Sequence, residues 1–218
     1  RPARAQDRSA LPDLGGVFGR MGRLGVVSLR FHRTELDSLE PLRGLVPLNP
    51  RDRIMELGFH ECRIRSGDLA PLAELDWLKK LVFRAVPEVV DLGPLAHLAS
   101  LTHLTLYDTS VADLGPLAGL TDLVQLLCQR TAVADLAPLG GLTNLRGLGL
   151  AGTRVGDLAP LAGLYRLEEL NLGGLTIPDL APLFDLPALG RLHLRGTRAP
   201  EDQLAALRAH RPALVVET

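Results

Sequence analysis

The sequence has few cysteines, aromatic residues and lysines, and it has no long apolar segment. Lys79 and Lys80 are the only lysines, so the other basic residues are arginines, and this composition is typical of a GC-rich bacterial gene. The longest apolar runs fall far short of the roughly 20 residues of a membrane span, so we expect no membrane partner. The formal net charge is −1, which implies no overall attraction to nucleic acid or to a membrane surface.

Signatures of catalysis are also missing. The sequence contains no G-x-x-x-x-G-K-[ST] phosphate loop, no H-E-x-x-H zinc motif and no G-x-S-x-G nucleophile turn. We therefore expect a protein that is not an enzyme and that needs no cofactor.

The sequence contains one short segment that recurs many times with small changes. The segment TRVGDLAPLAGL (Thr153–Leu164) follows TAVADLAPLGGL and TSVADLGPLAGL. Its proline recurs with spacings of 30, 23, 22, 22, 22 and 22 residues, at Pro41, Pro71, Pro94, Pro116, Pro138, Pro160 and Pro182. A fixed period in the twenties indicates a stack of short repeats.

Each repeat contains a short apolar and polar alternation. Leu104 and Leu106 alternate with Thr105 and Tyr107, which predicts a strand with one inward and one outward face. Because every repeat returns to the same starting point, successive strands must run parallel. The same alternation predicts eight strands, at Leu29/Phe31, Leu57/Phe59, Leu81/Phe83, Leu104/Leu106, Leu126/Cys128, Leu148/Leu150, Leu170/Leu172 and Leu192/Leu194.

The rest of each repeat predicts a return segment that closes the core. In the unit Leu101–Leu120, the inward residues of this segment are Val111, Leu114, Leu117 and Leu120. The letters D-L-x-P-L place an Asp where it can cap a short helical turn and a Pro in the first turn. Each buried apolar side chain contributes roughly 1.5–3 kcal/mol, so neighbouring repeats stabilise one another.

A column of small polar residues follows the strands. It contains Thr34, Cys62, Thr109, Thr131, Thr153 and Thr197. A hydroxyl reaches backbone groups at the tight turn after a strand, so we interpret the column as structural.

The unit L-x-x-L-x-L-x-x-T-x-V-x-D-L-x-P-L-x-x-L resembles the short 22-residue leucine-rich repeats of phosphatase regulatory subunits and bacterial internalins. The resemblance implies an α/β fold, a leucine-rich repeat solenoid of about eight units. It would place a parallel sheet on the concave face, short helical or 3-10 turns on the convex face, and a helical cap at the C-terminal end.

We expect three regions along the chain. Residues 1–23 are a linker or a partial N-terminal cap, residues 24–199 are leucine-rich repeats, and residues 200–218 are a C-terminal cap with an amphipathic helix. The 30-residue spacing predicts a surface insertion at Leu45–Asp52. The opening sequence suggests a chain that is part of a longer protein.

The two cysteines, Cys62 and Cys128, lie three repeats apart, which is about 14 Å at the usual strand spacing. That distance is too long for a disulfide. Two buried, reduced thiols favour a cytoplasmic location.

Outward side chains of the strands form a candidate binding surface. Its large polar members lie in the first five repeats, namely Arg30, His32, Arg33, His60, Glu61, Lys80, Arg84, His103, Tyr107, Asp108, Gln129 and Arg130. The next two repeats present mainly glycines (Gly147, Gly149, Gly152, Gly173, Gly174). These glycines either admit another backbone closely or are unselected surface.

The basic members of this surface favour an acidic protein over nucleic acid as the partner. Tyr107 is the only outward aromatic ring, whereas grooves for single-stranded nucleic acid usually carry several. His32 and His60 share a column with Glu61 nearby, but no Cys or Asp completes a ligand set, so we expect no metal.

Three hypotheses for function remain open. The first is a ligand-sensing, protein-binding module, and the DLAPLAGL-type units resemble the C-terminal sensor region of bacterial NACHT/STAND defence NTPases. The second is an extracellular adhesin of internalin type. The third is an architectural spacer without a partner.

Overall fold

The computed structural model describes residues 26–43 and 53–218 of the chain. Its main feature is a nine-stranded parallel sheet in which every strand pairs with the next along the sequence, apart from two short strands outside it. The nine strands are β1 (Val26–His32), β3 (Arg53–His60), β5 (Lys80–Arg84), β6 (His103–Tyr107), β7 (Gln125–Leu127), β8 (Gly147–Gly149), β9 (Glu169–Asn171), β10 (Arg191–His193) and β11 (Val215–Glu217). The eight predicted strands are confirmed, and β11 adds a ninth at the C-terminal end.

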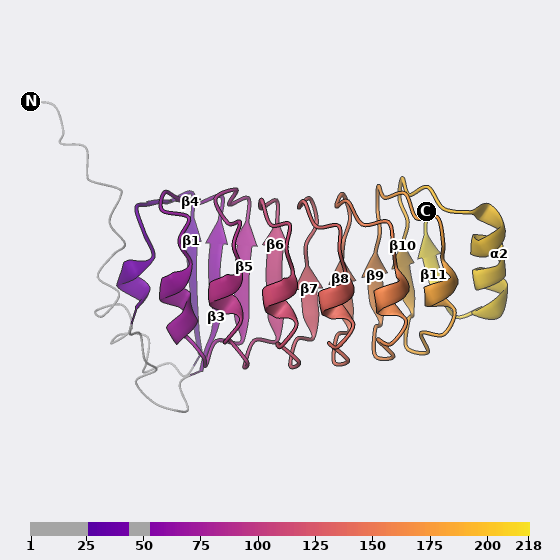
Figure 1. Cartoon of the computed structure of the whole chain (residues 1–218), viewed down its shortest axis with the longest axis horizontal. Helices are drawn as coiled ribbons and strands as arrows, with labels where there is room; N and C mark the ends of the chain where they lie inside the picture. Colours follow the sequence, from indigo (N-terminus) through magenta and orange to yellow (C-terminus); the bar gives the residue numbers. More distant parts are fainter. Residues whose placement is uncertain (1–25, 44–52) are drawn as a thin grey trace, which may run out of the picture.

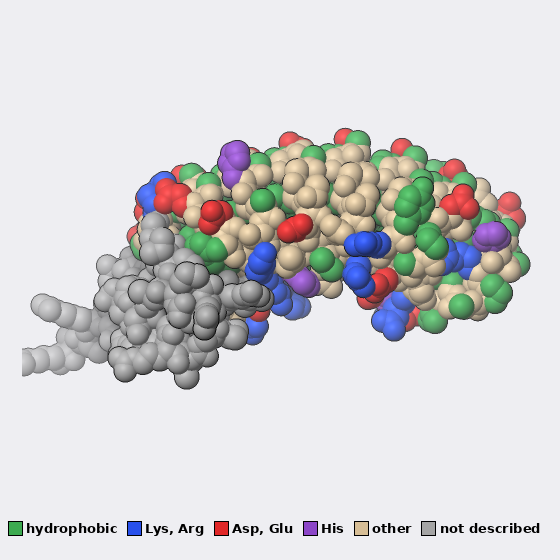
Figure 2. Space-filling model, turned by 90° about the horizontal axis from the view of Figure 1, so that it is seen from below, with side chains coloured by type: hydrophobic (Ala, Val, Ile, Leu, Met, Phe, Trp, Pro, Cys, Tyr) green, Lys and Arg blue, Asp and Glu red, His purple; other side chains and the backbone are tan. Residues whose placement is uncertain are grey.

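The sheet forms one side of a curved solenoid. In Figure 1 the strands lie side by side behind a row of short helical turns. Figure 2, viewed along the strands, shows an arc that is hollowed on the side of the sheet. A parallel sheet on the concave face and helical turns on the convex face are therefore confirmed.

The convex turns are 3-10 helices that begin with a proline in the first two positions of each. They are η1 (Glu40–Leu42), η2 (Ala70–Glu74), η3 (Gly93–Leu95), η4 (Gly115–Leu117), η5 (Ala137–Leu139), η6 (Ala159–Leu161) and η7 (Ala181–Leu183). A proline is tolerated there because its missing N–H would have no partner within the turn.

The predicted aspartate cap is present in six turns. Asp113 Oδ1, for example, accepts a hydrogen bond of 2.7 Å from the backbone N–H of Gly115, and Asp68, Asp91, Asp135, Asp157 and Asp179 do the same in their repeats. The aspartate lies one residue before the formal N-cap, so it caps the turn as an Asx turn.

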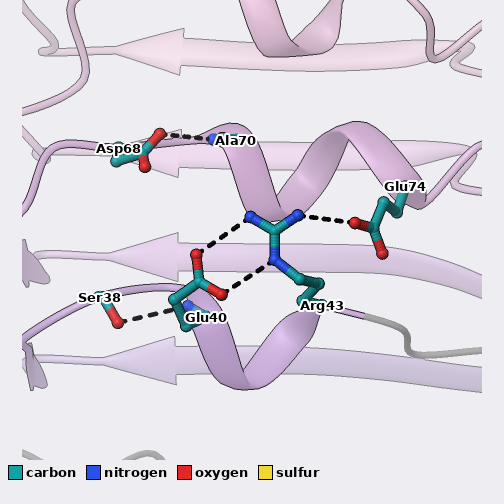
Figure 3. A network of polar contacts seen from close by, with 6 residues as sticks. All are labelled: Ser38, Glu40, Arg43, Asp68, Ala70 and Glu74. Atoms are coloured by element: carbon teal, nitrogen blue, oxygen red, sulfur yellow. Dashed lines mark hydrogen bonds and ion pairs between the residues drawn. The ribbon is translucent and has the colours of Figure 1, made fainter.

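The first two turns are also joined by an arginine. Ser38 replaces aspartate before η1, and its hydroxyl accepts a longer contact of 3.4 Å from the N–H of Glu40 (Figure 3). Arg43 binds both carboxylate oxygens of Glu40 and reaches Glu74 of η2 at 2.7 Å. These groups are exposed, so we expect them to set the register of the end repeat more than its stability.

The core lies between the sheet and the convex turns. Val111, Leu114, Leu117 and Leu120 are 0–1% exposed, as predicted. At the N-terminal end, the ring of Phe59 stacks between Phe31 and Phe83, with 5.3 Å between ring centroids on each side. Trp77 is partly buried against the same core.

The threonine column is a ladder of hydrogen bonds. The hydroxyls of Thr109, Thr131 and Thr153 each donate to the carbonyl three residues earlier, at 2.7–2.9 Å. Thr197 donates to Leu172 O of the preceding repeat, and Cys62 Sγ lies 3.4 Å from the carbonyl oxygens of Phe31 and His60. Beside this ladder, β2 (Glu35–Leu36) and β4 (Arg63–Ile64) form a second small parallel sheet.

The C-terminal end is closed by α2 (Glu201–His210) and β11. Acidic residues Glu201 and Asp202 occupy the first turn of α2 and basic residues Arg208 and His210 the last, which complements the helix dipole as predicted. Leu207 packs into the core, and the guanidinium of Arg211 donates to the carbonyl oxygens of Leu186, Pro187 and Leu189. These contacts attach the helix to the last repeat.

Cys62 and Cys128 are both buried free thiols, as expected. The predicted N-terminal region (1–23) and the predicted insertion (Leu45–Asp52) lie outside the described residues. Within the described ranges, no helix has the length and apolar character that a membrane crossing requires.

Candidate functional site

The register of the sheet sorts the outward residues of the concave face into three columns that cross the strands. The column nearest the start of the strands contains Ser28, Glu56, Lys80, His103, Gln125, Gly147, Glu169, Arg191 and Val215. The central column contains Arg30, Gly58, Val82, Thr105, Leu127, Gly149, Asn171, His193 and Glu217. The third begins with His32, His60, Arg84 and Tyr107.

The structure gathers the sequence-predicted site residues at the N-terminal half of this face. Seven project from the outward side of strands: Arg30 and His32 of β1, His60 of β3, Lys80 and Arg84 of β5, and His103 and Tyr107 of β6. Gln129 follows β7. The other four, Arg33, Glu61, Asp108 and Arg130, lie in the turn directly after a strand.

That turn has a left-handed backbone conformation in every repeat. The φ angle is 49–59° at Arg33, Glu61, Ala85, Asp108 and Arg130, and 69–75° at Gly152, Gly174 and Gly196. Left-handed geometry suits glycine and costs about 1–2 kcal/mol for most other residues. The sequence interpretation left open whether Gly152 and Gly174 admit another backbone closely or are unselected surface, and it missed this requirement of the backbone.

The type of residue at this left-handed turn differs between the N-terminal and the C-terminal repeats. At one structural position, three repeats use glycine and five retain a side chain despite the strain. Strained positions of this kind tend to persist where the side chain has a role. The left-handed turn therefore distinguishes the first five repeats from the last three.

Much of the basic charge on this half is neutralised by neighbouring repeats. Arg30 forms a bidentate pair with Glu56 at 2.9 Å, and Lys80 lies 3.4 Å from the same carboxylate. Burial alone would raise the pKa of Glu56, but the hydrogen bond from Arg30 and the charge of Lys80 lower it overall. The sequence predicted a basic cluster without these acidic partners.

Two further pairs lie in the left-handed turns. Arg33 Nε is 2.7 Å from Glu61 Oε2, and Arg130 Nε is 3.3 Å from Asp108 Oδ1. The five cations of the predicted cluster (Arg30, Arg33, Lys80, Arg84, Arg130) thus face three carboxylates (Glu56, Glu61, Asp108), which leaves an excess of two positive charges.

Arg84 differs from the other cations. Among the described residues, no carboxylate lies within ion-pair distance of its guanidinium, which instead lies over the ring of Tyr107 with Cζ 5.2 Å from the centroid. Arg130 approaches the same ring at 5.9 Å. Tyr107 therefore contacts cations from both neighbouring repeats.

His32 and His60 are brought together as their shared column predicted. Their rings stack with centroids 4.6 Å apart. Glu61, the acidic residue nearest to them in sequence, is engaged by Arg33. In the part of the chain that the structure describes, no group of three His, Cys, Asp or Glu residues is arranged to hold a metal ion.

The C-terminal half of the face contains two hollows that sequence reasoning missed. One, of about 430 Å³, is lined mainly by the first column and its flanks, including Gln125, Gly147 and Glu169. The other, of about 250 Å³, shares those three residues and adds Leu127 and Asn171 of the central column. Gly147 and Gly149 line these hollows without side chains of their own, and the amide of Gln129 occupies the space that a Cβ on Gly149 would need. The two outward glycines of β8 were the available signal in the sequence.

Beside the hollows, a histidine joins three strands. His193 of β10 contacts Glu169 of β9 through Nε2 and Glu217 of β11 through Nδ1, both at 2.9 Å. Since both ring nitrogens meet carboxylates, this contact links the last strands of the sheet.

Several solved protein structures have a fold similar to that of this chain. The chain is similar to internalin C2 from Listeria monocytogenes (27% identity over 91% of this chain and 82% of that one, TM-score 0.77). It is also similar to the L. monocytogenes internalin InlF (24% identity, 90% of this chain and 62% of that one, TM-score 0.73). The leucine-rich repeat protein LIC12759 from Leptospira interrogans matches with 22% identity over 96% of this chain and 52% of that one, with a TM-score of 0.76.

The chain thus spans about six tenths of InlF and about half of LIC12759. No family model matches the chain, and no curated protein does. The parallel sheet, the 3-10 turns and these structural neighbours together identify the fold: the chain is a leucine-rich repeat solenoid with a C-terminal helical cap.

Proposed function

We propose that the chain is a protein-binding module that recognises its partner with the concave face. The observation that carries this proposal is the left-handed turn, where the first five repeats keep Arg33, Glu61, Ala85, Asp108 and Arg130 although the later repeats use glycine. Inward residues repeat almost unchanged, whereas outward residues differ from repeat to repeat. That combination suits recognition by a rigid scaffold.

The proposal is tested by capturing partners with tagged protein in extracts of the source organism. Thr105 lies in the central column of the concave face, and Ala118 is exposed on the convex side of the same repeat. Thr105→Arg should abolish capture of the specific partner, while Ala118→Arg should leave it unchanged. Loss of capture only in Ala118→Arg would contradict concave recognition, and no specific partner for either variant or wild type would support a spacer.

For the wider setting, we infer a ligand-sensing region of a larger bacterial signalling or defence NTPase of NACHT/STAND type, located in the cytoplasm. Two buried free thiols, Cys62 and Cys128, support a reducing compartment. In this setting, partner binding would shift an oligomerisation equilibrium of the full protein. The test is nucleotide binding by the full-length gene product and a change in its oligomeric state when the partner is added.

A second setting is recognition outside the cell, as an adhesin of internalin type. The 27% identity to internalin C2 over 91% of the chain supports it. Cell fractionation separates the two settings, because the adhesin must be exported or held at the cell surface while the NTPase remains inside.

A further inference from the structure

The ring of Tyr107 contacts two guanidinium groups on the concave face. Arg84 comes from β5 on one side of β6, and Arg130 follows β7 on the other side. Their Cζ atoms lie 5.2 and 5.9 Å from the ring centroid. A guanidinium that stacks on an aromatic ring keeps its N–H groups directed outward at its edge, where they can donate to a planar anion.

The surrounding carboxylates leave these donors largely available. Glu56 is occupied by Arg30 and Lys80, and Glu61 by Arg33. The hydrogen bond and charge of Arg33 are the main reasons why the pKa of Glu61 is lowered, and the charge of Arg84 adds a smaller contribution without forming a pair. Asp108 Oδ1 lies 3.3 Å from Nε of Arg130.

Both guanidiniums are also accessible. Arg84 is exposed, and the side chain of Arg130 is 62% exposed. Arg130 and Asp108 both lie in left-handed turns, with φ of 59°. Both side chains are therefore retained at backbone positions that are strained for residues other than glycine. An excess of positive charge and two exposed guanidiniums beside one aromatic ring together define a surface for an anionic ligand.

We propose that Arg84, Tyr107 and Arg130 form a clamp for the carboxylate side chains of an acidic segment of the partner protein. This inference rests on the proposed function and names the chemistry of the partner. Nucleic acid fits less well, because Tyr107 is the only non-histidine aromatic residue on the described concave face and its ring is already engaged from both neighbouring repeats.

The experiment measures binding of a fluorescein-labelled ten-residue polyglutamate peptide by fluorescence anisotropy at 50 mM NaCl. Arg84→Glu should weaken binding about tenfold or more, because it places a like charge in the clamp. Tyr107→Leu and Arg84→Lys should each weaken binding by a smaller factor, since the first removes the stacking surface and the second the planar fork. Raising NaCl to 200 mM should weaken wild-type binding as well.

Arg154→Glu is the matched control, because Arg154 is an exposed arginine outside the clamp and no carboxylate pairs with it among the described residues. Its affinity should stay within about twofold of wild type, given that screening limits distant charges. Thermal unfolding of each variant shows that the fold is retained.

Equal peptide affinity in wild type and Arg84→Glu would overturn the clamp, as would tighter binding of a single-stranded oligothymidine than of polyglutamate. Capture of the cellular partner separates this inference from the proposed function. If Thr105→Arg abolishes capture while Arg84→Glu does not, the clamp is wrong and concave recognition stands.

Discussion

The imidazole of His60 stacks on that of His32 with ring centroids 4.6 Å apart and an interplanar angle of 13°. The two residues are direct partners in the register of β1 and β3. Nε2 of His60 is buried without a hydrogen-bond partner, above the backbone of Gly58. The arrangement disfavours protonation of His60.

This pair predicts a loss of stability in mild acid. Burial is the main cause of the lowered pKa of His60, the charges of His32, Arg30 and Arg84 lower it further, and Glu56 partly offsets them. Because the folded pKa lies below the unfolded value of about 6.5, the unfolded chain binds the proton first. The free energy of unfolding should therefore fall as pH drops from about 6.5 through the folded pKa.

His60→Gln should flatten that dependence between about pH 7 and pH 5, as measured by urea unfolding at each pH. His97→Gln, at an exposed position of the convex side, should keep the wild-type slope. An unchanged slope in His60→Gln would show that other groups control stability in this range.

The phenylalanine stack predicts a large effect at a single position. Phe59 is 0% exposed and contacts rings on both sides, so Phe59→Ala removes a buried side chain from the centre of the N-terminal repeats. The free energy of unfolding should fall by about 3–5 kcal/mol in urea titration. Val90→Ala, at a side chain that is 56% exposed, should change it by less than about 0.5 kcal/mol. A Phe59→Ala effect as small as the control would contradict the packing.

The left-handed turns predict opposite effects of opposite substitutions. Ala85 has φ of 54°, so Ala85→Gly should relieve strain and raise the free energy of unfolding by about 0.5–1 kcal/mol. Gly174 has φ of 75° and open space around its missing Cβ, so Gly174→Ala should lower it by about 1 kcal/mol through strain alone. Chemical denaturation measures both. Effects of the same sign in the two variants would show that backbone strain does not distinguish these turns.

The buried thiol predicts low chemical reactivity. Cys128 is 0% exposed, and burial raises the pKa of its thiol to about 12. In the native protein at pH 8, Cys128 should remain unmodified by iodoacetamide over hours. In the urea-unfolded protein, Cys128 should react readily. Mass spectrometry of the peptide that contains Cys128 measures both rates. Comparable rates in the two states would place Cys128 outside the core.

The sequence was sufficient for features that each repeat specifies on its own. Leucine spacing predicted the strands and their inward faces, and D-L-x-P-L predicted the capped 3-10 turns. The register that pairs His32 with His60 follows from aligning Leu29 and Phe31 with Leu57 and Phe59, although 28 residues separate the two histidines. These features depend on residues within one repeat or on the alignment of one repeat with the next, so a single sequence shows them.

Features that depend on side-chain geometry between repeats were not predicted. Arg30 of β1 pairs with Glu56 of β3, which is its diagonal neighbour and not its direct partner in the register. Predicting this pair requires the side-chain rotamers as well as the columns of the sheet. The left-handed turn was not predicted because Arg33 and Glu61 occupy it in the first repeats. Glycine, the residue that indicates a positive φ in a sequence, stands at this position only in the later repeats. The hollows around Gly147 depend on how Gln125 and Glu169 are directed, which the letters alone do not show.

Site-specific photo-crosslinking tests concave recognition most directly. A photoreactive amino acid is placed in turn at Thr105 on β6 and at Ala118 on the convex turn of the same repeat, and the protein is irradiated with its captured partner. Concave recognition predicts a cross-link to the partner from position 105 and none from position 118. Cross-links from position 118 alone would show that the partner binds the convex face and would contradict concave recognition.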